Sequence, residues 1–189
     1  MRGAAVFLNH KARLTAARDP EQTLLLLGEA RQFADTGGHE DVRRHIVLSE
    51  IRTRMLAPVK EGPRAEVAMQ RLREVEDYAD LMGAPSLACE ALHLRARILL
   101  ENGEASTAGK LLARAIAIAR RNAMNLRLNS AMTTYALSLL HRGRPLPAER
   151  LLYASLEMAK RARYNREITR VLRELEGPEF LDGKHSHGG

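Results

Sequence analysis

The sequence predicts an all-α fold built from stacked antiparallel helix pairs, and three observations predict it. Leu, Ala and Arg are frequent, aromatic residues make up 4% of the 189 residues and Trp is absent, a composition that favours helices over strands. Between breaks that contain Gly or Pro, apolar residues recur at three- and four-residue steps, as on one face of a helix. The same pattern returns at an interval of forty residues, which is the signature of a repeat protein.

The breaks divide the chain into helical segments. Prolines stand where the first turn of a helix tolerates a missing N–H group, at Pro20, Pro63 and Pro147. Glycines follow the helix ends, where a positive φ is needed, at Gly37, Gly83, Gly103 and Gly143. We therefore expect helices at residues 3–17, 20–35, 39–57, 63–82, 86–102, 105–123, 126–142, 146–163 and 165–176.

The repeat is clearest between residues 101–120 and 141–160. A turn glycine, an alanine, a leucine and a second alanine share their positions, at Gly103, Ala108, Leu112 and Ala119 and again at Gly143, Ala148, Leu152 and Ala159. Small residues let two helix backbones approach, and the leucine fills the space between pairs that cannot bury their apolar faces alone. Weaker echoes complete a single predicted domain over 1–176, with units at 3–35, 39–82, 86–123 and 126–163, a terminal helix at 165–176 and a flexible tail at 177–189.

On these positions the chain resembles the tetratricopeptide-repeat (TPR) superfamily. The family's large–small–large pattern, turn glycine and small–large–small pattern fall on Leu92, Ala96, Leu99, Gly103, Ala108, Leu112 and Ala115, and in the next unit on Met132, Ala136, Leu139, Gly143, Ala148, Leu152 and Ser155. The spacing is forty residues instead of the common ~34, and Leu92 and Met132 replace the usual tryptophan. The chain is therefore most similar to the long-repeat subgroup of bacterial regulators and eukaryotic scaffolding subunits. The resemblance implies a right-handed α-solenoid.

The resemblance also implies a site on the concave face, which the first helix of each pair lines. By the repeat register its residues are Glu90, His93, Arg97 and Glu101 in one unit and Ser130, Thr133, Leu137 and His141 in the next. Arg97 and Leu137 occupy the position of the asparagine in the family's carboxylate clamp, so we expect that clamp activity to be absent. Arg97 and His93 could hold an acidic peptide through charge-assisted hydrogen bonds. The alternative is that Arg97 pairs with Glu90 or Glu101 on its own helix.

Positive charge is concentrated in the C-terminal half. Residues 1–102 hold 15 Lys or Arg and 15 Asp or Glu, whereas residues 103–176 hold 14 and 6. The basic surface set comprises Arg120, Arg121, Arg127, Lys160, Arg161, Arg163, Arg166 and Arg170. Three interpretations stay open: solvated helix C-termini, which favour cations, an acidic protein partner, or nucleic acid bound through its phosphates. Few aromatic residues in this half offer base stacking, which weakens the last interpretation.

The apolar stripe of the last helix is expected either to close the repeat array or to seat a partner. Its members are Ile168, Val171, Leu172 and Leu175. The apolar start "AAVFL" lacks a polar capping repeat, which suggests a fragment of a longer solenoid or a subunit of an assembly, with self-association through the solenoid ends.

Motifs for catalysis, metals or cofactors are absent from the sequence, and we expect none of the three. His185 and His187 are expected to lie in a frayed tail instead of a metal site. Cys89 is the single cysteine, which favours a reducing, intracellular compartment, cytoplasmic or nuclear. Apolar runs fall short of the ~20 residues that span a bilayer. We therefore expect a non-catalytic protein–protein interaction scaffold or adaptor, with a ligand- or peptide-responsive regulatory module and a nucleic-acid-associated protein as alternatives.

Overall fold

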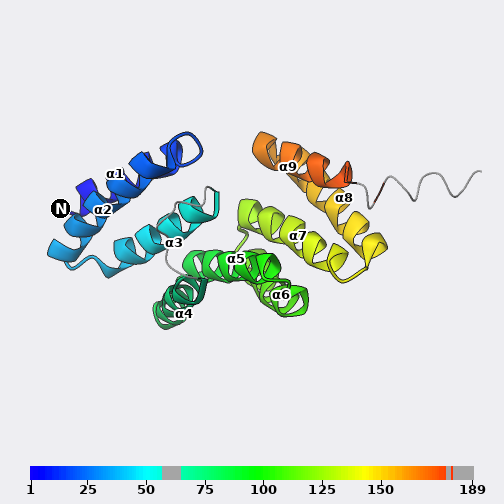
Figure 1. Cartoon of the computed structure of the whole chain (residues 1–189), viewed down its shortest axis with the longest axis horizontal. Coiled ribbons are helices and arrows are strands. Elements are labelled where there is room, and N and C mark those ends of the chain that lie inside the picture. Colours follow the sequence, from blue (N-terminus) through cyan, green and yellow to red (C-terminus); the bar gives the residue numbers. More distant parts are fainter. Residues whose placement is uncertain (57–64, 178–179, 181–189) are drawn as a thin grey trace, which may run out of the picture. The chain divides into compact units, whose positions relative to one another are not determined.

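The computed structural model describes residues 1–56, 65–177 and 180, and the secondary structure of these residues is entirely helical. The helices are α1 (Arg2–Thr15), α2 (Pro20–Thr36), α3 (Glu40–Leu56), α4 (Ala65–Leu81), α5 (Pro85–Glu101), α6 (Ala105–Arg121), α7 (Asn125–Leu140), α8 (Pro145–Ala162) and α9 (Asn165–Leu175), labelled in Figure 1. Their order and bounds confirm the predicted helices to within two residues. The predicted end at 57, the predicted start at 63 and most of the predicted tail lie outside the described residues.

Consecutive helices pack on one another in two compact units, Met1–Leu94 and Arg95–Gly189, whose boundary falls within α5. In the first unit α1 packs on α2, α2 on α3 and α3 on α4. In the second unit α6 packs on α7, α7 on α8 and α8 on α9. In each unit, therefore, every helix packs mainly on the helices next to it in the sequence. The right-handed superhelix and the single domain over 1–176 stay predictions.

Six of the described turns between helices share one backbone geometry, which the turn between α1 and α2 lacks. A residue with positive φ follows the helix, and the next residue donates its N–H to a carbonyl five positions back, as Glu104 does to Leu99 at 2.8 Å and Met124 does to Ala119 at 2.9 Å. Glycine supplies the positive φ at four turns, Gly38, Gly83, Gly103 and Gly143, whereas Ala123 and Arg163 adopt it without glycine. The prediction for Gly37 was wrong by one residue, because Gly37 has a φ of −90° and belongs to the helix end.

The predicted interior positions of the repeat are confirmed by burial. The leucine is fully buried in α4, α6 and α8, and the two alanines on either side of it are buried as well. The residues are Ala68, Leu72 and Ala79 in α4, Ala108, Leu112 and Ala119 in α6, and Ala148, Leu152 and Ala159 in α8. The forty-residue spacing therefore marks structurally equivalent positions.

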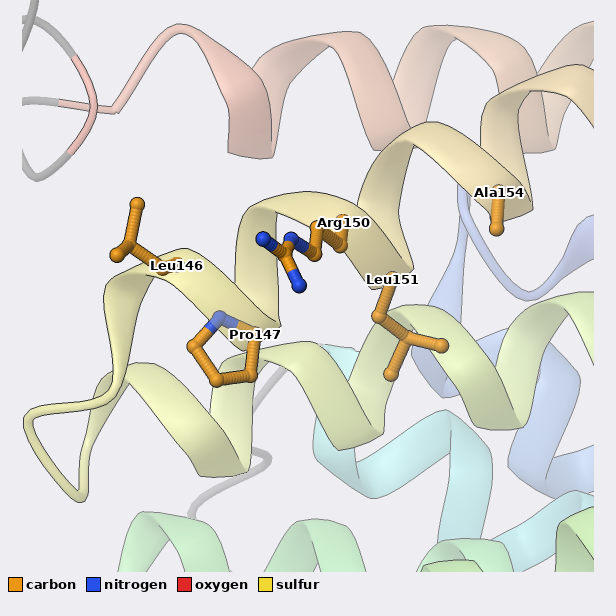
Figure 2. Close-up of a pocket in the computed structure, with 5 residues that line it drawn as sticks. All are labelled: Leu146, Pro147, Arg150, Leu151 and Ala154. Carbon is orange, nitrogen blue, oxygen red and sulfur yellow. The ribbon is translucent and has the colours of Figure 1, made fainter.

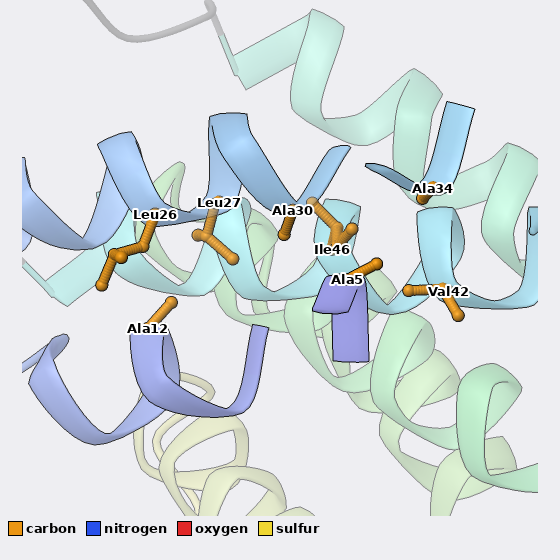
Figure 3. Close-up of a cluster of buried hydrophobic side chains, with 8 residues drawn as sticks. All are labelled: Ala5, Ala12, Leu26, Leu27, Ala30, Ala34, Val42 and Ile46. Atoms are coloured by element: carbon orange, nitrogen blue, oxygen red, sulfur yellow. The ribbon is translucent and has the colours of Figure 1, made fainter. Parts of the chain in front are cut away.

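One hydrophobic cluster of the first unit lies between α1, α2 and α3, and half of its eight buried residues are alanines (Figure 3). Alanines of α1 and α2 permit close approach of the two backbones, and branched residues fill the remaining space. The buried residues are Ala5, Ala12, Leu26, Leu27, Ala30, Ala34, Val42 and Ile46.

The core of the second unit includes the terminal helix α9. Val171 is fully buried, and Ile168 and Leu175 pack against the same cluster, which Ala136, Leu139, Ala148, Leu152, Leu156 and Phe180 complete. Leu172 remains 41% exposed. Most of the apolar stripe of α9 is thus used inside the unit, which agrees with the interpretation of α9 as a closing helix.

Candidate protein-binding site

The first unit holds Glu90 and His93 of the predicted concave face, both on α5. Glu90 is buried and forms an ion pair with Arg52 of α3. A carboxylate removed from water requires such a partner, so Glu90 joins α5 to α3 instead of facing a bound segment as predicted. His93 is half-buried.

Thr133 of α7 also lies inside the protein and not on an exposed face. Its hydroxyl donates to the carbonyl of Asn129 at 3.1 Å and lies 2.9 Å from the hydroxyl of Ser155 on α8. The Asn129 amide in turn donates to the carbonyl of Ser155 at 2.6 Å. The physical reason is that α7 packs against α6, α8 and α9, so little of its circumference reaches solvent. The prediction that Thr133 is presented to a partner is corrected accordingly.

The other predicted residues of the second unit keep some exposure. Ser130 and Leu137 of α7 are half-buried, and His141, just beyond α7, is exposed. Their spacing of seven and four residues places them along one side of the helix. Glu101 at the end of α5 is exposed.

Arg97 and Arg170 approach each other within the second unit. Arg97, on α5, is half-buried. Burial lowers the pKa of its guanidinium, repulsion from Arg170 of α9 lowers the pKa further, and attraction by Glu101 opposes both. Arg170 donates to the hydroxyl of Thr134 on α7 at 2.9 Å and lies 3.8 Å from a carboxylate oxygen of Glu167. One residue of the predicted concave face and one of the predicted basic surface are therefore close enough for the charge of Arg170 to act on Arg97.

The repeat register contains the signal that places Arg170 here. Arg170 follows Ser130 by forty residues, as Ser130 follows Glu90. Extending the register by one unit into α9 adds Arg170 to the face that α5 and α7 line. Thr134 has no such signal, because the residue forty positions earlier is the buried Leu94.

The remaining basic residues mostly occupy helix ends. Arg120 and Arg121 lie in the last turn of α6, and Lys160 and Arg161 in the last turn of α8. Cations at these ends complement the partial negative charge of the last carbonyls. Arg163 and Arg166 are exposed in and after the next turn, whereas Arg127 is half-buried. Helix-end placement agrees with the solvated interpretation for the four residues of α6 and α8.

A shallow apolar depression lies along α8 (Figure 2). All its lining residues come from this one helix: Leu146, Pro147, Arg150, Leu151 and Ala154. Because Leu146 is 68% exposed, the depression is open to solvent. None of the predicted site residues lines it.

The described part of the chain carries neither a membrane-spanning helix nor a cluster of metal-binding side chains. Over residues 1–56, 65–177 and 180 no helix has the length and apolarity needed to cross a membrane. Within the same ranges no three His, Cys, Asp or Glu side chains gather as a metal site would require. His185 and His187 lie outside these ranges. On α1, Phe7 and Leu14 are exposed, and self-association through the solenoid ends stays a prediction.

Comparison with known proteins adds no relative to this picture. No protein-family model matches the chain, and no curated protein shows significant similarity to it. The resemblance to TPR proteins thus rests on the repeat positions alone. The structure shows that the elements of the described residues are helices that pack on their neighbours in sequence.

Proposed function

We propose that the protein is a non-catalytic interaction module, acting as a scaffold or adaptor, whose second unit binds an acidic segment of a partner protein. The binding face comprises the end of α5 with α7 and α9. The single observation that carries the proposal is that Arg97 is half-buried and that the positive charge of Arg170, which Thr134 holds by a hydrogen bond, acts on it.

A carboxylate between the two guanidinium groups would relieve this repulsion. Arginine donates in a planar fork that suits a carboxylate, and charge-assisted hydrogen bonds of this type are about twice as strong as neutral ones. Thr134 already holds the Arg170 guanidinium through a 2.9 Å hydrogen bond, so part of the ordering cost is met before binding.

The flanking acids restrict which partner fits. Glu101 acts on Arg97, and Glu167 lies beside Arg170, so the arginines attract an anion mainly where it reaches both of them. A single Asp or Glu side chain meets that requirement. A nucleic-acid backbone, with regularly spaced phosphates, would also approach the two carboxylates and be repelled. The arrangement therefore favours an acidic peptide over nucleic acid.

The single cysteine bears on the cellular compartment of the protein. Cys89 is buried as a reduced thiol, and we propose that the protein works in a reducing, intracellular compartment. Because repeat folds serve many partners, the fold alone names none of them. A regulatory module that responds to the same acidic segment is the second candidate, distinguished by a change in radius of gyration on binding.

The experiment is a binding titration with labelled peptides that carry Asp or Glu between apolar residues, next to peptides with Asn or Gln in the same places. We expect saturable binding of the acidic set. Arg97→Gln and Arg170→Gln should each weaken it about tenfold, since a hydrogen bond to a charged group is worth roughly 1.5–3 kcal/mol.

The matched control is Arg173→Gln, which removes an exposed arginine one turn further along α9. Equal losses in all three variants would mean general charge attraction and would contradict the proposed site. Binding of DNA or RNA that falls steeply with salt and ignores Arg97→Gln would instead support the basic helix ends.

A further inference from the structure

The first unit contains a charge cluster that the proposed function does not use. Glu50 of α3, 8% exposed at its side chain, is surrounded by three arginines from three helices. Arg31 of α2 forms an ion pair with one carboxylate oxygen of Glu50. Arg71 of α4 donates to the other oxygen at 2.8 Å, and Nη1 of Arg54 lies 3.8 Å from that same oxygen.

The charges of this cluster do not balance. Among the described residues, three guanidinium groups form ion pairs with one carboxylate, so about two positive charges remain. Burial lowers the pKa of Arg54, Glu50 raises it, and both Arg71 and Arg31 lower it further. The charged groups that act on Arg54 therefore include one acid and two further cations.

Two hydrogen-bond donors of the cluster also lack a partner. The Nε and Nη1 atoms of Arg54 are buried without a hydrogen-bond partner. Buried donors of a charged group are costly when unpaired. Joining α2, α3 and α4 does not need them, because Glu50 already pairs with Arg31 and Arg71. Arg54 thus adds charge and donors beyond what helix packing uses.

Solvent reaches the cluster from the side of Arg31. The side chain of Arg31 is 40% exposed, whereas those of Arg54 and Arg71 are 26% and 23% exposed. A small anion can reach the exposed part of Arg31, and the buried Nε and Nη1 of Arg54 must turn toward it before they can bind it.

We infer that Arg31, Arg54 and Arg71 form a binding site for a phosphate group. A phosphate dianion matches the excess of two positive charges, and its several oxygens can accept from Arg31 and, once the Arg54 side chain turns toward it, from the unpaired Nε and Nη1 of Arg54. A carboxylate would neutralise half of the excess. Free phosphate and a phosphoryl group on a protein or metabolite share this chemistry. The site belongs to the first unit and does not depend on the acidic-peptide site of the second.

The test is a titration of the whole protein with inorganic phosphate. Binding is measured by isothermal titration calorimetry and by the broadening of the ³¹P NMR line. The titration is run at mildly alkaline pH, with chloride holding the ionic strength constant. We expect one saturable site that sulfate, a tetrahedral dianion, competes for and that acetate does not. Arg54→Gln should weaken phosphate binding about tenfold or more.

Two controls locate the site. Arg43→Gln removes an exposed arginine on the same helix, whose partners are Asp35 and Glu40. Arg97→Gln removes the arginine of the acidic-peptide site. Both variants should bind phosphate as the unchanged protein does. A loss with Arg97→Gln but not with Arg54→Gln would move phosphate to the second unit and overturn the inference.

Folding of the variants is checked by circular dichroism. Should Arg54→Gln not fold, Arg54→Lys keeps the charge and loses the Nε and Nη donors, and it should bind phosphate more weakly. The competition of sulfate and acetate with phosphate is measured on the unchanged protein and therefore does not depend on the folding of any variant. Absence of saturable phosphate binding, or equal competition by acetate, means that the cluster only joins helices and contradicts the inference.

Discussion

The two units bury polar side chains in different ways. The first unit buries acids as well as the neutral Thr23, Ser49 and Thr53, with Glu50 among three arginines and Glu90 paired with Arg52. The second unit buries neutral groups, with Asn129, Thr133 and Ser155 joined by hydrogen bonds across α7 and α8. Buried ion pairs depend on every partner being present, whereas a neutral network loses less when one member is removed. The same helical architecture should therefore respond to mutation differently in its two halves.

One repeat position shows this difference directly. Glu76 in α4 is buried at the position that Ile116 occupies in α6 and Leu156 in α8, forty and eighty residues later. The position is interior in each helix, but only the first unit fills it with an acid. Periodicity thus conserves burial from unit to unit while the chemistry of the buried group changes.

The largest effect is expected from Glu50→Gln. The substitution keeps the shape of the side chain and removes the negative charge that three guanidinium groups surround. Loss of one partner from a buried ion pair costs about 3–5 kcal/mol, so the free energy of unfolding in urea should fall by that amount. Glu157→Gln, at the exposed pair with Lys160, is the control and should cost less than about 1 kcal/mol. Similar values for the two variants would remove the contrast between buried charge and surface charge.

A smaller effect is expected from Ala148→Leu in α8. Ala148 is fully buried against Leu152 and Leu139 in the core of the second unit. A leucine there overpacks the close approach of two helices, and the melting temperature should fall by an amount that corresponds to roughly 1–3 kcal/mol. Ala154→Leu, on an exposed position of the same helix, should leave melting nearly unchanged. A neutral result for Ala148→Leu would show that the helices do not approach closely at the repeat alanine.

The smallest effect is expected from Thr133→Val in α7. The substitution keeps the branched shape and removes the hydroxyl that bonds to Asn129 and Ser155. The cost should be about 1 kcal/mol, since Ser155 keeps a second acceptor in the Asn129 carbonyl at 3.4 Å. Chemical denaturation measures this loss of unfolding free energy. Thr36→Val, which removes an exposed hydroxyl, is the control variant. A cost as large as that of Glu50→Gln would mean that neutral and charged networks are equally demanding here.

Sequence reasoning placed the helices and the interior of the repeat well but placed the polar side chains poorly. Leu72, Leu112 and Leu152 are all fully buried, as their shared register predicts. Glu90 and Thr133, predicted on an open face by the same register, are buried with polar partners. Periodicity identifies the apolar face of a helix, but it does not say which neighbouring helix a polar side chain will meet.

The sequence by itself determined the helical class, the helix bounds and the spacing of small and large interior residues. These depend on helix propensity, on glycine and proline at the turns, and on a period within single helices, all of which are local. Tertiary structure alone decided the contact of Arg170 with Thr134 and the three arginines around Glu50. The reason is physical: charged side chains are long, and their partners are chosen by the stacking of helices that lie tens of residues apart in the chain.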